Sequence, residues 1–204
     1  MKISKMLPEH LDPAIEAKLK AYQALLLKWQ KAINLVSPST LDKAWHRHFH
    51  DSLQLASFVP RETSVADLGS GAGFPGLVLA IARPDLKVHL IESDERKGQF
   101  LKTVSRETQT VVQIHTARVE KLLPDLQVDI ITARAFASLE SICDYVTVAA
   151  EKNPALTMLL LKGRDAAQEI KEARRSYNFD VETIPSQTEE GAFILKVQNL
   201  QKTL

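Results

Sequence analysis

The sequence contains a single cysteine, Cys143, among its 204 residues. This excludes an internal disulfide bond and fits a reducing compartment. No apolar run approaches the ~20 residues that a membrane-spanning helix needs, and the N-terminus has no apolar segment of a signal peptide. Neither sign of charge is in excess, because 26 Lys and Arg residues balance 25 Asp and Glu residues. These absences predict a cytoplasmic protein with no membrane partner, in which any contact with nucleic acid depends on local basic patches.

The stretch 65–76 organises the rest of the chain. It reads Val-Ala-Asp-Leu-Gly-Ser-Gly-Ala-Gly-Phe-Pro-Gly, so an apolar run leads directly into Gly69, Gly71 and Gly73. The apolar run 77–81 that follows predicts the first turns of a helix. Glycines at such a turn allow positive φ angles and let a ligand approach the main chain. The pattern is typical of a strand, glycine turn and helix that bind a nucleotide-type cofactor.

A carboxylate supports this interpretation. Glu92 ends the β-like run 87–92 and follows Gly73 by 19 residues, where a carboxylate can accept hydrogen bonds from both hydroxyls of a ribose. Residues 71–76 formally match the G-x-G-x-x-G pattern of dehydrogenases. The fuller string, with Asp67 before the glycines, resembles the first motif of class I S-adenosylmethionine methyltransferases. We favour S-adenosylmethionine, with an NAD-dependent oxidoreductase and a glycine turn without a ligand as the alternatives.

Strands and helices alternate from residue 64 onward. This order predicts a mostly parallel sheet with helices on both faces, and the absence of a helix between the last two strands predicts a terminal antiparallel hairpin. The fold class is therefore α/β, a Rossmann-like seven-stranded sheet of the class I methyltransferase type. We expect strands at 64–68, 87–92, 111–115, 127–133, 156–162, 178–184 and 192–198, and helices at 75–83, 94–107, 138–150 and 165–176.

Two amphipathic helices precede the sheet. Apolar side chains recur every three or four residues in 10–35 and again in 41–58, which predicts one buried face on each helix. We expect residues 1–60 to form an N-terminal helical cap. Residues 61–204 then form the cofactor-binding domain, and the two parts make one compact unit.

The second of these helices carries the run His46-Arg47-His48-Phe49-His50-Asp51. Histidines four residues apart share a helical face, as zinc ligands must. The segment lacks the glutamate of H-E-x-x-H, and no third ligand is evident elsewhere. We therefore predict no metal site, and expect His48 and Asp51 to make polar contacts that join the cap to the domain.

Six strings that occur together and in order resemble one family, the bacterial 16S ribosomal RNA guanine-N7 methyltransferases, also called the glucose-inhibited division protein B family. The strings are Trp29…Asn34-Leu35, Arg47-His48…Asp51-Ser52, residues 67–76, Arg118-Val119-Glu120, residues 134–139 and Lys162-Gly163. The resemblance implies transfer of a methyl group from S-adenosylmethionine to N7 of guanine 527. It also implies a partner, 16S rRNA or a small ribosomal subunit particle.

The resemblance also implies the site residues. It places Gly69 and Phe74 against the cofactor at the glycine turn, Val119 and Glu120 around the adenine, and Arg134 on the far side of the pocket. Gly71 and Gly73 join the predicted cofactor residues because they let a ligand approach the main chain. Two residues depart from the family pattern. Glu92 stands where many members carry aspartate, and Val36 stands where threonine is common.

The chemistry of guanine N7 needs no general base, because N7 carries a lone pair and no proton. The protein must instead hold N7 and the methyl carbon at roughly 3–3.5 Å and in line. We expect Arg134 to orient the reactants by donating to guanine O6 or to the carboxylate of the cofactor.

The alternative of an oxidoreductase is less favoured, because the sequence shows no evident proton-transfer pair beside the position of a nicotinamide. The remaining alternative, a non-catalytic RNA-binding module, would not need Glu92 or the glycines.

Overall fold

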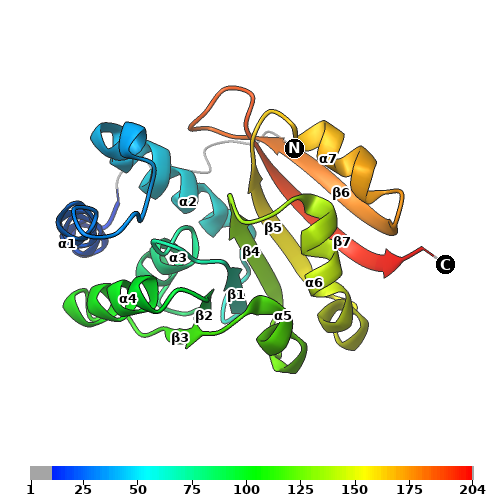
Figure 1. Ribbon diagram of the computed structural model, residues 1–204, viewed down its shortest axis with the longest axis horizontal. Coiled ribbons are helices and arrows are strands. Elements are labelled where there is room, and N and C mark those ends of the chain that lie inside the picture. The colour runs from blue at the N-terminus through cyan, green and yellow to red at the C-terminus, as the bar shows by residue number, and fades with distance from the viewer. Residues whose placement is uncertain (1–10, 204) are drawn as a thin grey trace.

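The computed structural model describes residues 11–203. Seven strands form one sheet in the order β3-β2-β1-β4-β5-β7-β6 (Figure 1). The first five strands in this order are mutually parallel, whereas β7 is antiparallel to both β5 and β6. The predicted fold class is therefore confirmed, including the terminal hairpin. The strands are β1 (Ser64–Leu68), β2 (Lys87–Glu92), β3 (Gln113–Thr116), β4 (Ile130–Arg134), β5 (Thr157–Lys162), β6 (Tyr177–Pro185) and β7 (Phe193–Lys202).

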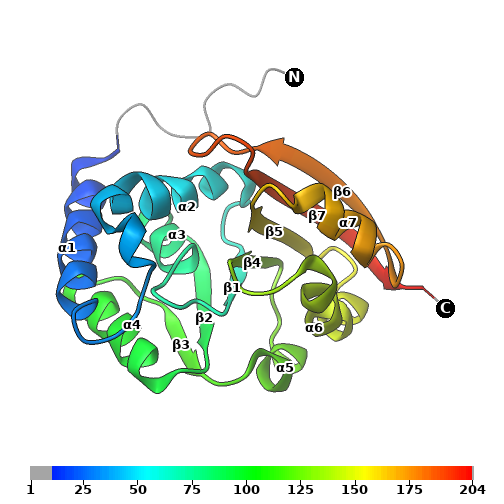
Figure 2. The same ribbon diagram turned by 45° about the horizontal axis from the view of Figure 1, so that its top comes forward.

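Helices cover both faces of the sheet, with α1 to α4 on one face and α5 to α7 on the other (Figures 1 and 2). The α-helices are α1 (Pro13–Trp29), α2 (Asp51–Leu53), α3 (Gly76–Ala82), α4 (Glu95–Glu107), α5 (Val119–Leu122), α6 (Leu139–Lys152) and α7 (Ala166–Ala173). The short helix α5 was not predicted from the sequence. None of the helices within residues 11–203 is both long and apolar enough to cross a membrane.

The sheet sends alternate side chains into two separate cores, because successive residues of a strand point to opposite faces. Val65 packs in the core formed with α1, α3 and α4, and its neighbour Ala66 packs in the core formed with α6 and α7. Burial on both faces explains why the parallel strands read as nearly continuous apolar runs.

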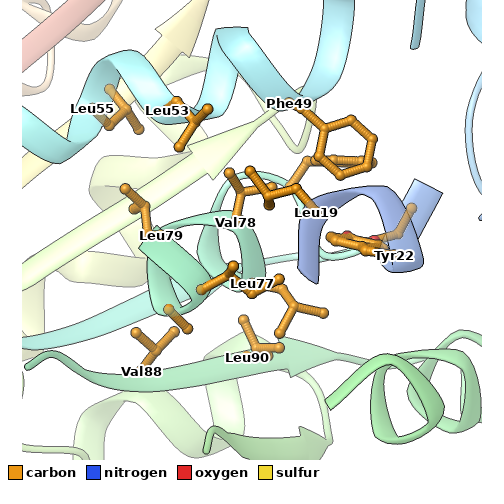
Figure 3. Close-up of a cluster of buried hydrophobic side chains, with 14 of the residues drawn as sticks. Leu19, Tyr22, Phe49, Leu53, Leu55, Leu77, Val78, Leu79, Val88 and Leu90 are labelled. Carbon is orange, nitrogen blue, oxygen red and sulfur yellow. The ribbon is translucent and has the colours of Figure 1, made fainter. Parts of the chain in front are cut away.

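The N-terminal cap belongs to the first of these cores. Figure 3 shows Leu19 and Tyr22 of α1 and Phe49 of the cap close to Leu77 and Val78 of α3. All five side chains are fully buried. The cap and the sheet therefore share apolar packing, while the expected division at residue 60 stays a prediction and residues 1–10 lie outside the described part.

The two cap helices differ from the prediction, the first in its length and the second in its helical pitch. The first ends at Trp29, because the Gln30 side-chain oxygen accepts hydrogen bonds from the amides of Leu35 and Val36 and so stabilises a turn there. The second is a series of short helical segments of different pitch. The Ser52 hydroxyl donates to the His48 carbonyl at 2.7 Å, a contact that competes with the helical backbone pattern. The segments are a 3₁₀ helix (Pro38–Lys43), a π-helix (Trp45–His50), α2 and a second 3₁₀ helix (Gln54–Phe58).

Candidate functional site

A cavity of about 750 Å³ lies at the carboxyl ends of the parallel strands, with the cap on one side and the loop between β6 and β7 on another. Ligands of open α/β sheets bind at this edge. Seven of the eight predicted cofactor residues line the cavity, and Gly73 does not. The seven are Gly69, Gly71, Phe74, Glu92, Val119, Glu120 and Arg134.

The glycine turn that follows β1 depends on left-handed backbone. Gly69 and Gly71 have φ angles of +62° and +56°, which residues with a Cβ rarely adopt. A Cβ on Gly71 would meet only the Gly69 oxygen, at 3.8 Å, whereas a Cβ on Gly69 would come within 2.2 Å of the Phe136 ring. Gly71 is therefore the position at which a ligand can approach the main chain, while Gly69 gives room to an aromatic side chain of the protein.

Gly73, unlike Gly71, is enclosed by side chains of the protein. Its φ angle is +92°, and a Cβ there would come within 2.5 Å of the Tyr22 hydroxyl and 3.0 Å of Leu77. These are side chains of the core beneath the turn, so the absence of a side chain at Gly73 allows α1 to approach. Its part in cofactor binding stays a prediction.

Glu92 connects the end of β2 to the glycine turn. Its Oε2 accepts a hydrogen bond from the Gly71 amide at 2.8 Å, and its Oε1 accepts one from the Asp94 amide at 2.8 Å. The side chain lies in the cavity wall with 7% of the residue exposed. Each carboxylate oxygen has a second lone pair, so the group can still accept hydrogen bonds from a ligand.

Asp67, the acidic residue of the motif, does not line the cavity. It is fully buried, and its two oxygens accept hydrogen bonds from the Thr132 hydroxyl and the Gly76 amide. Burial raises the pKa of Asp67 to about 6, against the opposing effect of these hydrogen bonds. Asp67 therefore joins β1, β4 and the start of α3 beneath the turn.

The first residues of α5 form a further wall of the cavity. Val119 is buried and Glu120 is exposed, so this wall offers one apolar and one anionic side chain. Arg118 and Lys97 lie beside them and carry positive charge into the same cavity. Neither cation forms an ion pair with any residue between 11 and 203.

Arg134 at the end of β4 joins the domain to the cap. Its Nη1 donates to the Arg47 carbonyl at 3.0 Å and to Nδ1 of His48 at 2.8 Å. Asp51 lies 3.6 Å from the same nitrogen, and the guanidinium stands 4.9 Å above the centre of the Phe74 ring. Burial lowers the pKa of Arg134, and the Asp51 carboxylate opposes that shift.

His48 is neutral because of these neighbours. A guanidinium can only donate, so Nδ1 of His48 accepts and Nε2 carries the proton that it donates to the Thr40 hydroxyl at 2.9 Å. Burial, together with the charges of Arg134 and Arg47, lowers the pKa of His48 to about 3. The expected contact between His48 and the domain is confirmed.

The other cap residues contact the loop between β6 and β7. Oδ1 of Asp51 accepts a hydrogen bond from the Thr188 hydroxyl at 2.7 Å, and His46 donates to the Thr188 carbonyl at 2.7 Å. Arg47 pairs with Glu189. Sequence reasoning missed Thr188 and Glu189, because no local pattern connects a hairpin loop to a helix more than 130 residues away.

The sequence matches one protein family over most of its length. The family model described as "rRNA small subunit methyltransferase G" (GidB) matches residues 15–193. A ribosomal RNA small subunit methyltransferase G from Methylorubrum extorquens is 42% identical over 201 residues, which cover 95% of this chain and 92% of that protein. The protein of the same name from Rhodospirillum centenum is 46% identical over 184 residues, with 90% and 83% covered.

Solved structures share the fold at low identity. The O-methyltransferase TomG from Streptomyces achromogenes, solved in complex with SAM, matches with a TM-score of 0.56 and 16% identity over 93% of this chain and 91% of that one. A SAM-dependent methyltransferase from Aquifex aeolicus matches with a TM-score of 0.54 and 14% identity over 81% and 98% of the two chains.

Proposed function

This chain belongs to the rRNA small subunit methyltransferase G family, and we propose that it transfers the methyl group of S-adenosylmethionine to N7 of guanine 527 in 16S rRNA. The match of the family model over residues 15–193 carries this proposal. Membership decides among the functions that the sequence left open, in favour of methyl transfer over hydride transfer or RNA binding alone. We also propose that the protein acts in the cytoplasm, on rRNA within a small ribosomal subunit particle.

The cavity residues fit this cofactor. Gly71 presents main chain without a side chain in the way, and the Glu92 carboxylate stands next to it with lone pairs for two ribose hydroxyls. Val119 offers an apolar surface for the adenine. Bound S-adenosylmethionine supplies a methyl group that its sulfonium already activates.

The side chains around the cavity support a mechanism by positioning. Guanine N7 holds no proton, so the protein needs no base to generate the nucleophile. His48 accepts a hydrogen bond from Arg134 and has a pKa of about 3, so its imidazole is uncharged at neutral pH and does not take up a proton there. We assign His48 to holding Arg134 in place rather than to proton transfer.

Arg134 is the residue that we propose orients the reactants. The guanidinium lines the cavity, and its hydrogen bonds to the described residues all start from Nη1. Its Nε and Nη2 can therefore donate to guanine O6 or to the carboxylate of the cofactor.

Arg118 and Lys97 are the cavity cations without an acidic partner among residues 11–203, and we assign them to RNA phosphates.

A transfer assay with two forms of the substrate tests this proposal. Purified protein and methyl-labelled S-adenosylmethionine are incubated with small subunits, or with protein-free 16S rRNA, from a strain that lacks this chain. We expect one methyl group per small subunit and less transfer to free rRNA. Equal transfer to both would contradict the particle as the substrate, and absence of label in both would contradict the proposed function.

A further inference from the structure

The loop between β4 and α6 forms a wall of the cavity beside the glycine turn. Phe136 in this loop lies directly over Gly69, as the 2.2 Å approach to a Cβ on that glycine demonstrates. The preceding residue, Ala135, has a φ angle of +49°. A non-glycine residue in this region is uncommon and persists only where its surroundings hold it.

One partly buried ion pair holds the far end of this loop. Nζ of Lys162, at the end of β5, lies 2.6 Å from Oε2 of Glu169 in α7, and the two side chains are 9% and 21% exposed. The same ammonium donates to the Ala137 carbonyl at 2.7 Å, and the same carboxylate oxygen accepts from the Leu139 amide at 2.7 Å. Lys162 and Glu169 thus bind main-chain groups on both sides of Ser138, and we call them the loop clamp.

The N-terminal end of the loop is held by contacts with the cap. Arg134, the last residue of β4, directly precedes the loop and is bound to the cap through Arg47 and His48. The cap therefore fixes where the loop starts, and the loop clamp fixes where it ends. Phe136 lies between these two attachments.

We propose that Lys162 and Glu169 are positioning residues for methyl transfer, which place Phe136 as the wall against which the acceptor guanine is held. This inference rests on the proposed function. An aromatic face at the cavity wall suits a purine, because base–aromatic stacking is favourable for every base. Lys162 touches neither reactant and acts through the loop.

The alternative role of Lys162 is a direct contact with an RNA phosphate. Its burial and its two existing acceptors oppose that role. The two roles also predict opposite effects at Glu169. If Lys162 bound phosphate, Glu169→Gln would free the ammonium and tighten RNA binding. If the pair clamps the loop, Glu169→Gln lowers the rate as Lys162→Met does.

The clamp and the phosphate contact can be distinguished by the single-turnover rate of methyl transfer at saturating RNA and cofactor. The rate is measured for Glu169→Gln, Lys162→Met and the double variant. We expect each single variant to be slower by about tenfold to a hundredfold, the cost of a displacement on the ångström scale. The double variant should be no slower than the slower single variant, because the residues act as a unit. KM for RNA should stay within about twofold. Asp85→Asn, in an ion pair with Arg83 outside the cavity lining, is the control that should keep the wild-type rate.

Amide hydrogen exchange tests the clamp without RNA or cofactor. In Glu169→Gln, the Leu139 amide of the ligand-free protein should exchange at least about tenfold faster, while core amides of β1 keep their protection. This readout separates failure of the inference from failure of the proposed function. Unchanged exchange at Leu139, a wild-type rate in Glu169→Gln, or tighter RNA binding by that variant would each overturn the inference.

Discussion

The hydroxyl of Tyr22 in α1 donates a hydrogen bond to the main-chain carbonyl of Ala72 in the glycine turn. Tyr22 is fully buried, and its ring stacks on Phe74 with 5.4 Å between the ring centres and an angle of 12°. The same hydroxyl fills the space that a Cβ on Gly73 would need. The N-terminal cap therefore supports the glycine turn directly.

Removal of this hydroxyl should weaken cofactor binding. Tyr22→Phe leaves the buried Ala72 carbonyl without its donor, so we expect the free energy of unfolding to fall by about 1–3 kcal/mol. The affinity for S-adenosylmethionine should fall as well, because the turn loses its support. Denaturant titration and calorimetry measure the two quantities.

Tyr177→Phe is the matched control for Tyr22→Phe. Tyr177 packs in the second core, away from the glycine turn, and its hydroxyl donates to the exposed Asp144. The control should lose stability and keep its affinity for S-adenosylmethionine. Wild-type affinity in Tyr22→Phe would show that the cap does not shape the turn for the cofactor.

The glycines of the turn should separate into two kinds. Both Gly71→Ala and Gly73→Ala force a Cβ into left-handed backbone, at a cost of about 1–2 kcal/mol each. Only the Cβ at residue 73 also collides with Tyr22 and Leu77. We expect a clearly lower melting temperature for Gly73→Ala, and near-native melting with weakened cofactor binding for Gly71→Ala. Equal melting temperatures for the two variants would contradict this assignment.

Glu92 should contribute to binding through its charge. In Glu92→Ala the ribose hydroxyls and the Gly71 amide lose their acceptor, so S-adenosylmethionine should bind more weakly by about 1–3 kcal/mol. S-adenosylhomocysteine should lose as much, since it contains the same ribose. Glu95→Ala, at an exposed position in the first turn of α4, is the control. Calorimetry that finds wild-type affinity for both ligands in Glu92→Ala would refute the contact.

The buried His48 should make stability depend on pH. Its folded-state pKa of about 3 lies below the ordinary 6.5, so the unfolded chain takes up the proton first. The contribution of neutral His48 to the free energy of unfolding is therefore complete above pH 6.5 and is lost as the pH falls toward 3. The stability difference between wild type and His48→Gln should shrink by about 2 kcal/mol from pH 7 to pH 5. Denaturant titration at both pH values measures it, and a constant difference would mean that His48 is not buried as a neutral group.

This comparison cancels contributions from other groups. Burial raises the pKa of Asp67 to about 6, so the unfolded chain loses that proton more readily. Asp67 therefore adds stability as the pH falls through 6, with a sign opposite to that of His48. A pH scan of wild type alone would mix the two effects.

The sheet and the position of the cavity could be predicted from local patterns. The apolar run before Gly69 and the carboxylate that ends the next strand occur within 30 residues of each other and reflect backbone requirements of one βαβ unit. Residues 185–191, which contain no helical pattern, similarly predicted the antiparallel hairpin.

The supporting contacts could not be predicted in this way. Tyr22 fits an apolar helix stripe, and nothing in that stripe indicates that its hydroxyl reaches Ala72. The motif likewise does not indicate that Gly73 lies against the Tyr22 hydroxyl. Lys162 belongs to one of the family strings, but its partners Glu169 and Ala137 could not be predicted, because they come from α7 and from the loop between β4 and α6.

The modification state of one nucleotide tests the central claim most directly. Borohydride and aniline cleave RNA at N7-methylguanine, so 16S rRNA from a strain that lacks this chain can be mapped at single-nucleotide resolution. We predict that cleavage at guanine 527 disappears in that strain and returns when the wild-type chain, but not Glu92→Ala, is supplied. Cleavage that persists at guanine 527 without the chain would contradict the account.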